Sequence, residues 1–271
     1  MPDQPFRENV VVITGASAGI GRELALQLAE QGAWLALAAR EAAPLEATAA
    51  DCRDRGARAI AVPTDVADES QCRALVERTA AEYGRIDTLV NNAGIGMWAR
   101  FEDVTDLAPF ERIMRVNYLG SVYCTHYALP HLKRTRGRIV GISSLTGKTG
   151  VPTRSGYAAS KHAMTGFFDS LRIELEDSGV SVTMVYPGFV ATEIRERALG
   201  PDGQPLGKGN SPVREREVMS AEECARQTLH AAACRRRELI MTLRGKVGWM
   251  LKLVAPTLVD RIARKAIEQG K

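Results

Sequence analysis

Residues 10–21 read Val-Val-Val-Ile-Thr-Gly-Ala-Ser-Ala-Gly-Ile-Gly, an apolar, β-branched run that passes directly into a glycine-rich turn. Such a run is typical of a strand buried on both faces of a sheet. Helical periodicity from Glu23 to Ala29 predicts a helix after the turn, with its end near Gly32. Glycines allow the backbone to approach a pyrophosphate, and a helix N-terminus offers unpaired N–H groups. The stretch therefore predicts a dinucleotide-binding strand–turn–helix unit.

Six further apolar runs recur along the chain, each separated from the next by a segment with helical periodicity. They are residues 34–38, 59–62, 86–90, 138–142, 180–185 and 238–241. Parallel strands require helical crossovers, so the alternation predicts an α/β fold with a doubly wound, seven-stranded parallel sheet and helices on both faces. We expect residues 1–243 to form this single Rossmann-fold domain and residues 244–271 to form a basic amphipathic C-terminal extension.

The composition sets limits on the function. The chain has 271 residues, of which 45% are hydrophobic and 25% charged, as in an ordinary globular protein. Five cysteines without C-x-x-C spacing, and histidines without metal-ligand spacing, predict neither a disulfide framework nor a metal site. The N-terminus lacks the basic and apolar regions of a secretory signal, which favours a cytoplasmic protein. The net charge of +4 belongs to the C-terminal extension, so we predict no nucleic-acid partner.

The glycines of the first turn follow a Gly-x3-Gly-x-Gly spacing, not the general G-x-G-x-x-G fingerprint. With the preceding Thr14, this spacing resembles that of the short-chain dehydrogenase/reductase (SDR) family. The resemblance continues in the family's order to about residue 192, through Asn91-Asn92-Ala93-Gly94, Asn117, Ser144, Tyr157-Ala158-Ala159-Ser160-Lys161 and Pro187-Gly188-Phe189-Val190-Ala191-Thr192. It implies an oxidoreductase that transfers a hydride between a nicotinamide and an alcohol or carbonyl carbon, and a homodimer or homotetramer.

The end of the second predicted strand indicates which nicotinamide cofactor is preferred. An enzyme that binds the 2′-hydroxyl of NAD places an acidic residue near Ala39, whereas here Arg40 follows. Arg40 can bind a 2′-phosphate, with Ser17 and Arg22 as further donors, so we predict NADP(H). The alternative is that Arg40 is only a solvated loop charge.

Together with Ser17 and Arg40, the residues that the resemblance places at the cofactor make up the predicted cofactor site. The full set is Gly15, Ser17, Gly19, Ile20, Gly21, Arg40, Asp65, Val66, Asn92, Ala93, Gly94, Tyr157, Lys161, Pro187, Gly188, Val190 and Thr192. For one of these, Asp65, the residues leave a second interpretation open, because a carboxylate there is equally suited to cap a helix that begins near Asp68.

Tyr157 and Lys161 are four residues apart, which on a helix puts both side chains on one face. Ser144 precedes Tyr157 at the carboxyl end of a strand, the edge where open α/β sheets carry ligands. By the resemblance, Tyr157 is the acid/base, Ser144 orients the substrate, and Lys161 binds the nicotinamide ribose and assists Tyr157. Asn117 then orders a water near the lysine, and a second interpretation, a buried amide that satisfies backbone groups, is compatible with that role.

Two questions about the function stay open at this stage. An NADP(H)-binding regulatory protein without turnover is the alternative to an enzyme, although all four catalytic residues are retained. The apolar residues beside the motifs indicate an apolar pocket for a small-molecule alcohol or ketone, and the alternative is that they belong to the core. They are Met97, Trp98, Leu145, Val151, Pro152 and Phe189.

A glycine- and proline-rich stretch at residues 200–212 interrupts the alternation of strands and helices. Because it follows the Pro187-Gly188 segment, we predict a mobile substrate loop, residues 190–219, that orders over the substrate.

In the C-terminal extension, seven Lys or Arg residues are interleaved with apolar ones and opposed by two acidic residues. The longest charge-free run, Leu253–Val259, is too short to span a bilayer, and Pro256 is expected to divide the extension into two helices. The pattern leaves open docking on the protein's own body, contact with a twin subunit, or peripheral contact with a membrane surface.

Overall fold

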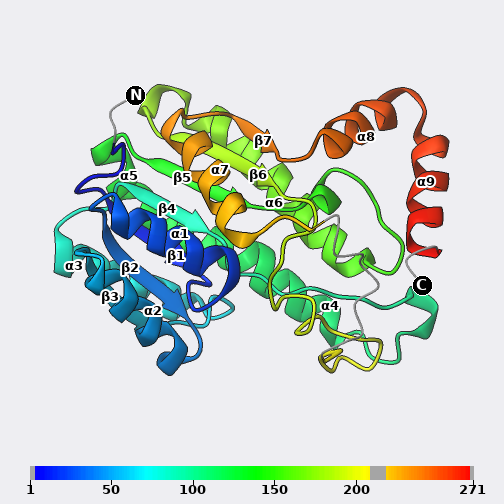
Figure 1. Ribbon diagram of the computed structural model, residues 1–271, viewed down its shortest axis with the longest axis horizontal. Helices are drawn as coiled ribbons and strands as arrows, with labels where there is room; N and C mark the ends of the chain where they lie inside the picture. Colours follow the sequence, from blue (N-terminus) through cyan, green and yellow to red (C-terminus); the bar gives the residue numbers. More distant parts are fainter. Residues whose placement is uncertain (1–3, 208–217, 269–271) are drawn as a thin grey trace.

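The computed structural model describes residues 4–207 and 218–268, in which seven parallel strands form one sheet of order β3-β2-β1-β4-β5-β6-β7 (Figure 1). The predicted fold class is confirmed. The strands are β1 (Val10–Thr14), β2 (Trp34–Ala39), β3 (Arg58–Pro63), β4 (Thr88–Asn91), β5 (Arg138–Ile142), β6 (Ser181–Tyr186) and β7 (Glu238–Ile240).

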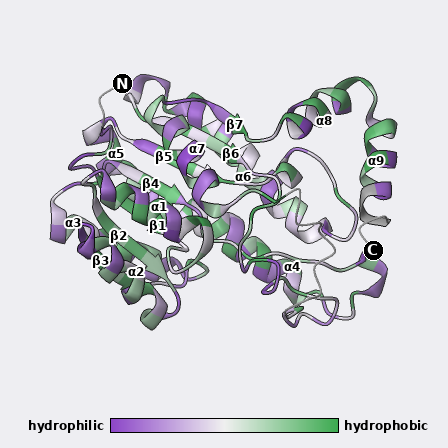
Figure 2. Ribbon diagram, viewed as in Figure 1, coloured by the Kyte–Doolittle hydropathy of each residue, from purple (hydrophilic) through white to green (hydrophobic). Residues whose placement is uncertain are grey.

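Helices cover both faces of the sheet, because successive side chains of each strand point to opposite sides. Val11 and Ile13 of β1 belong to one core cluster, with α1 (Gly19–Glu30), α2 (Ala42–Asp54) and α7 (Ala221–Ala233). Val10 and Val12 belong to the other, with α3 (Glu69–Tyr83), α5 (Gly120–Thr135) and α6 (Ser155–Glu174). The near-continuous apolar runs of the strands follow from this burial on both sides (Figure 2).

The strand order reverses between β1 and β4. From β1 the chain winds outward to β2 and β3, then returns to β4 on the other side of β1 and continues to β7. In open α/β sheets, ligands bind at the carboxyl ends of the strands at such a switch point. The turns after β1 and β4 therefore position the candidate site. Between them and β5 lies the short α4 (Ala108–Ile113), which continues through a π-helical segment, Met114–Leu119, into α5.

The C-terminal extension forms two helices that project from the sheet, α8 (Leu243–Val254) and α9 (Pro256–Glu268) (Figure 1). The predicted break at Pro256 is confirmed, and proline is well suited to the first helical position. Trp249 of α8 packs against the core, and Lys252 Nζ donates to the Lys148 carbonyl at 3.1 Å. α8 is thus attached to the domain, while α9 packs on α8.

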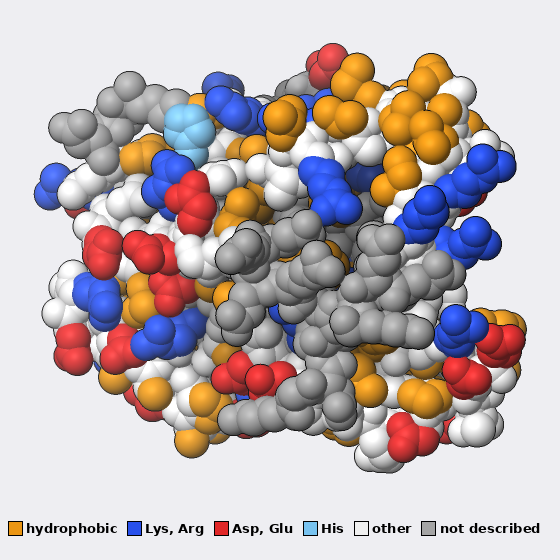
Figure 3. Space-filling view, turned by 45° about the vertical axis from the view of Figure 1, so that its right-hand side comes forward, with side chains coloured by type: hydrophobic (Ala, Val, Ile, Leu, Met, Phe, Trp, Pro, Cys, Tyr) orange, Lys and Arg blue, Asp and Glu red, His pale blue; other side chains and the backbone are white. Residues whose placement is uncertain are grey.

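The extension exposes an unusual share of the large apolar side chains. Leu253 and Val254 are 70% and 81% exposed. In Figure 3 hydrophobic side chains at the upper right lie beside Lys and Arg side chains. Among residues 4–207 and 218–268, no helix is both long enough and apolar enough to cross a membrane.

Candidate active site

The turn between β1 and α1 requires its three glycines. Gly15 and Gly19 have φ of +67° and +54°, a left-handed conformation that side chains disfavour. A Cβ on Gly21 would lie 2.2 Å from the Gly15 carbonyl oxygen and 2.5 Å from Asn92 Nδ2. Within the described chain, Ala18 at the N-cap of α1 offers no side-chain cap. A bare backbone and the uncapped start of a long helix together fit a pyrophosphate.

Thr14, the last residue of β1, connects this turn to the turn after β4. Its Oγ1 accepts hydrogen bonds from the backbone N–H groups of Asn92 and Ala93, both at 3.0 Å. Asn92 Nδ2 in return donates to the carbonyls of Thr14 and Gly15, at 2.9 and 3.1 Å. Asn92 and Ala93 are site residues predicted from the sequence, whereas Thr14 is predicted only as the residue before the glycine turn. Through these hydrogen bonds of Thr14 and Asn92, the turn after β1 and the turn after β4 form one wall of the site.

A groove of about 450 Å³ runs along the carboxyl ends of β1, β2 and β3. It is lined by most of the residues that the sequence analysis assigned to the cofactor, namely Gly15, Ser17, Gly19, Ile20, Arg40, Asp65, Val66, Asn92, Ala93, Gly94 and Thr192. Gly21 packs behind the turn and does not face the groove.

The polar residues at the far end of this groove differ in their partners. Arg40 is exposed and, among the described residues, forms no ion pair. Arg22, predicted as a second cation beside it, instead pairs with Asp51 at 2.7 Å. Asp68 caps α3 through hydrogen bonds from the backbone N–H groups of Ser70 and Gln71. The alternative interpretation of Asp65 as this cap is therefore wrong.

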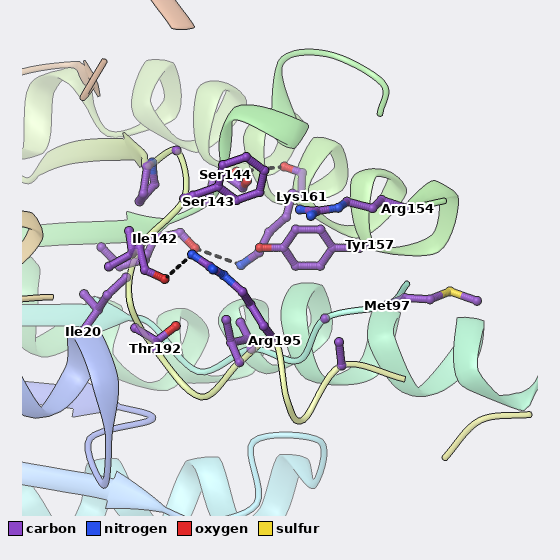
Figure 4. Close-up of a pocket in the computed structure, with 18 of the residues that line it drawn as sticks. Ile20, Met97, Ile142, Ser143, Ser144, Arg154, Tyr157, Lys161, Thr192 and Arg195 are labelled. Carbon is purple, nitrogen blue, oxygen red and sulfur yellow. Dashed lines mark hydrogen bonds between the residues drawn. The ribbon is translucent and has the colours of Figure 1, made fainter. Parts of the chain in front are cut away.

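Tyr157 and Lys161 lie one turn apart near the start of α6, with the lysine Nζ 5.8 Å from the centre of the tyrosine ring (Figure 4). Lys161 is only 3% exposed and donates to the Ile142 carbonyl at 2.9 Å. Burial lowers its pKa to about 8. Burial also raises the pKa of Tyr157, and the nearby Arg154 and the hydroxyl of Ser144 partly oppose that increase.

Asn117 lies in the π-helical segment, completely buried behind this pair. Its side chain accepts from the Ile95 N–H at 2.8 Å and donates to the Ile95 carbonyl at 3.0 Å and to Ser160 Oγ at 2.9 Å. The amide therefore satisfies backbone groups, which is compatible with the predicted role of Asn117. The amide also lies near the lysine, because a Cβ on Gly94 would be 3.2 Å from Asn117 Oδ1 and 3.5 Å from Lys161 Nζ.

A second cavity, of about 120 Å³, lies in front of Tyr157. It is lined by the predicted Ser144, Tyr157, Lys161, Pro187, Gly188, Val190 and Thr192. Both cavities are bordered by the same five residues, Ile20, Asn92, Gly94, Thr192 and Ile194. A ligand that fills the groove can therefore extend to the face of Tyr157.

The comparisons with known proteins agree with this geometry. The sequence profile described as short chain dehydrogenase matches residues 9–200. The chain belongs to the short-chain dehydrogenase/reductase family, a family of oxidoreductases. It is 40% identical over 232 residues to an 11-beta-hydroxysteroid dehydrogenase-like 4A of Arabidopsis thaliana, covering 85% of this chain and 75% of that protein.

Two other relatives match nearly the whole SDR chain. A Dehydrogenase/reductase SDR family protein 7-like of Dictyostelium discoideum is 34% identical, over 97% of this chain and 83% of its own length. The crystal structure of an SDR from Burkholderia phymatum in complex with NAD superposes with a TM-score of 0.83 at 28% identity, covering 94% of this chain and 96% of that chain.

Two arginines of this SDR's inner cavity, Arg154 and Arg195, are not among the residues predicted from the sequence. The predicted Met97, Trp98 and Phe189 do line it. Both arginines stand three residues from a motif residue, Arg154 before Tyr157 and Arg195 after Thr192. This proximity was the only signal in the sequence, since residues outside helices and strands follow no periodicity.

The segment after β6 closes the inner cavity on one side. Its two ends are joined, because the Ala191 N–H donates to the Met219 carbonyl and the Met219 N–H to the Phe189 carbonyl, each at 2.9 Å. Between these ends, residues 208–217 of the predicted substrate loop lie outside the described residues.

Proposed function

We propose that this SDR is an NADP(H)-dependent enzyme that transfers a hydride between the nicotinamide and an alcohol or carbonyl carbon of a small molecule. The observation that carries the proposal is the position of Ser144, Tyr157 and Lys161 in one cavity that continues into the glycine-lined groove. When bound, the nicotinamide supplies or accepts the hydride.

The chain's own residues then manage the proton. In the direction of reduction, negative charge develops on the substrate oxygen, and Tyr157 donates a proton to that atom. The Ser144 hydroxyl holds the same oxygen against the tyrosine. Lys161 beside the ring favours the tyrosinate that is left and binds the cofactor's ribose. Asn117 supports Lys161 and fixes the start of α6 through Ser160.

Arg40 is the basis for NADP(H) over NAD(H). It is exposed at the end of the groove after β2, where its guanidinium can reach a 2′-phosphate together with the Ser17 hydroxyl. The three further cofactor contacts after β6, Pro187, Gly188 and Val190, border the inner cavity and are assigned to the nicotinamide end.

A test of this function is the oxidation of NADPH with a panel of ketones and aldehydes, and the reduction of NADP⁺ with secondary alcohols. Turnover that requires Tyr157 supports the enzyme. Tight binding of NADPH without turnover of any compound would instead favour the regulatory protein, whose cofactor acts as a signal. NADH used with equal or better kcat/KM would contradict the assignment of Arg40.

We propose that residues 1–243 form the catalytic domain and that its segment 190–219 is a mobile loop that orders over the substrate. Support comes from the joined ends at Val190 and Met219, which make the segment a loop with a fixed base. Hydrogen exchange tests this proposal, because a loop that is as protected as the central strands in the cofactor-free protein cannot be mobile.

We propose that α8 and α9 bind an anionic membrane surface peripherally, as an extension of a cytoplasmic protein. The support is the combination of exposed apolar side chains with the basic residues Arg244, Lys246, Lys252, Arg261, Arg264 and Lys265. Vesicle flotation tests this proposal. The full chain and a chain that ends at Leu243 are each mixed with vesicles that contain phosphatidylglycerol. Salt-sensitive binding that truncation removes is expected; truncation that only dissociates oligomers would assign α8 and α9 to a subunit contact.

The predicted homodimer or homotetramer stays a prediction. Light scattering after size-exclusion chromatography measures it directly, and a monomeric protein would contradict it.

A further inference from the structure

Two arginine side chains extend into the inner cavity toward the space in front of Tyr157 (Figure 4). The Arg154 guanidinium lies 4.1 Å from the centre of the Trp98 ring and 5.3 Å from that of Phe189. Arg195 approaches the same Phe189 ring, at 5.5 Å. The two cations therefore share one aromatic neighbour beside the catalytic tyrosine.

Their positive charge is not balanced by the described part of the chain. No aspartate or glutamate lines this cavity, and neither arginine is in an ion pair with any of residues 4–207 or 218–268. The Arg195 side chain donates to the Val190 carbonyl at 3.1 Å, and Arg154 Nε is buried without a hydrogen-bond partner among the described residues. Burial lowers the pKa of both guanidinium groups. Both arginines are half-buried, and cations withdrawn from solvent are normally paired, so among the described residues this pair lacks an anion.

Stacking on aromatic rings explains only part of the arrangement. A guanidinium stacks through its face, while its N–H groups point outward in the plane and stay available for hydrogen bonds. The planar fork matches a carboxylate, which accepts two parallel hydrogen bonds. Trp98 and Phe189 thus hold the guanidinium of Arg154 in place, with N–H groups available to an acceptor such as a carboxylate.

We propose that Arg154 and Arg195 bind a carboxylate of the substrate, so that this enzyme acts on an oxo acid or hydroxy acid with an apolar body. The inference rests on the proposed function and specifies its substrate class. Met97, Trp98 and Phe189 contact the apolar body, and the arginines bind the acid. In reduction, the hydride passes from NADPH to the carbonyl carbon and the proton from Tyr157 to its oxygen, giving the hydroxy acid and NADP⁺. The carboxylate itself is unchanged.

Matched pairs of acids and neutral esters test the proposal. We choose benzoylpropionate and acetylbutyrate, each with its methyl ester, because the reacting ketone is the same within a pair. For the wild type, kcat/KM is expected to be about 10-fold or more higher for the acids, since hydrogen bonds to charged groups are strong. Arg154→Gln and Arg195→Gln should lower kcat/KM for the acids by about 10-fold and leave the esters within about 3-fold. The control Arg73→Gln removes an exposed arginine that pairs with Glu77, and it should change neither.

Binding of a carboxylate without a ketone separates this inference from the proposed function. Phenylbutyrate should bind the complex with NADP⁺, more weakly in high salt and not detectably to Arg154→Gln, whereas methyl phenylbutyrate should not compete. Carboxylate binding without turnover of any ketone or alcohol would refute the proposed function and support only the carboxylate site at Arg154 and Arg195.

Three results would overturn the inference. The first is equal kcat/KM for acids and esters, and the second is the absence of any carboxylate binding. The third is a rise in the Kd of NADPH for Arg195→Gln in the absence of substrate, because that would assign this arginine to the cofactor's phosphates. Thermal unfolding of each variant confirms that a loss of activity is not a loss of fold, and Arg154→Lys, which keeps the charge, should retain part of the preference for acids.

Discussion

The burial of Lys161 leads to a prediction about protein stability that can be measured without a substrate. Lys161 is nearly inaccessible, and burial lowers its pKa from 10.5 to about 8. In the cofactor-free protein, the charged form therefore costs stability at neutral pH. Replacing the residue by Met keeps an unbranched apolar chain and removes the charge.

The magnitude follows from linkage. The folded-state pKa lies below that of the unfolded chain, so the unfolded state binds more protons between about pH 8 and 10.5 and stability rises with pH in that window. The full shift of the Lys161 pKa corresponds to a destabilisation of the folded state by about 3 kcal/mol at low pH. About 2 kcal/mol of this destabilisation disappears between about pH 7 and 9.5. The hydrogen bond to Ile142 that Lys161→Met loses adds a cost to the variant, but this cost is much less dependent on pH.

Urea denaturation of the wild type and of Lys161→Met across this pH range measures the difference. We expect the free energy of unfolding of the wild type to rise by about 2 kcal/mol relative to that of the variant as the pH rises. The contributions of the other titrating groups are the same in both proteins and cancel in this difference. Lys148→Met is the matched control. Burial acts to lower the pKa of Lys148, but its hydrogen bond to Glu238 outweighs burial and raises the pKa, so its contribution is lost only above the tested range. A pH-independent difference for Lys161→Met would refute the reasoning.

Three further predictions concern cofactor and catalysis. Tyr157→Phe should keep NADPH binding and lose about 10²- to 10⁴-fold in kcat, because the ring stays and the proton donor is removed; wild-type kcat would disprove the role of Tyr157. Arg40→Ala should raise KM for NADPH about 10-fold and leave KM for NADH nearly unchanged, and equal effects on both would contradict the 2′-phosphate contact. Gly21→Ala should destabilise the fold by about 1–3 kcal/mol and weaken NADPH binding, because its Cβ meets the Gly15 carbonyl at 2.2 Å. Gly166→Ala, with nothing within 4 Å of the added Cβ, is its control in urea denaturation and should not destabilise.

The sheet could be predicted from the sequence because buried parallel strands are continuous apolar runs, and the helices between them fix the order of winding. The predicted strand at residues 86–90 nevertheless begins two residues late, at Thr88. At this end of the strand the Asp87 carboxylate accepts the Val10 N–H at 2.9 Å in place of a backbone carbonyl, while the Asp87 N–H still donates to the Val10 carbonyl at 2.9 Å. Propensity describes backbone pairing and does not predict such a substitution.

The candidate site was predictable where it depends on spacing. Gly15, Gly19 and Gly21 have conformations or contacts that only glycine allows, and Tyr157 and Lys161 lie one helical turn apart. Arg154 and Arg195 were not predictable, because they meet through the ring of Phe189 from segments about 40 residues apart. Only the tertiary structure brings such residues together.

The border between the two cavities has a consequence for the order of events in turnover. Thr192 and Ile194 belong to one short segment, yet they face both the groove and the space in front of Tyr157. A ligand in the groove that restricts this segment would reduce the conformational entropy that a second ligand must remove, and the two affinities would then be coupled without any further structural change. The coupling is reciprocal, since each ligand must raise the affinity for the other by the same factor. With such coupling, we expect sequential binding with the dinucleotide first, because the larger ligand would order the wall against which the smaller one is held.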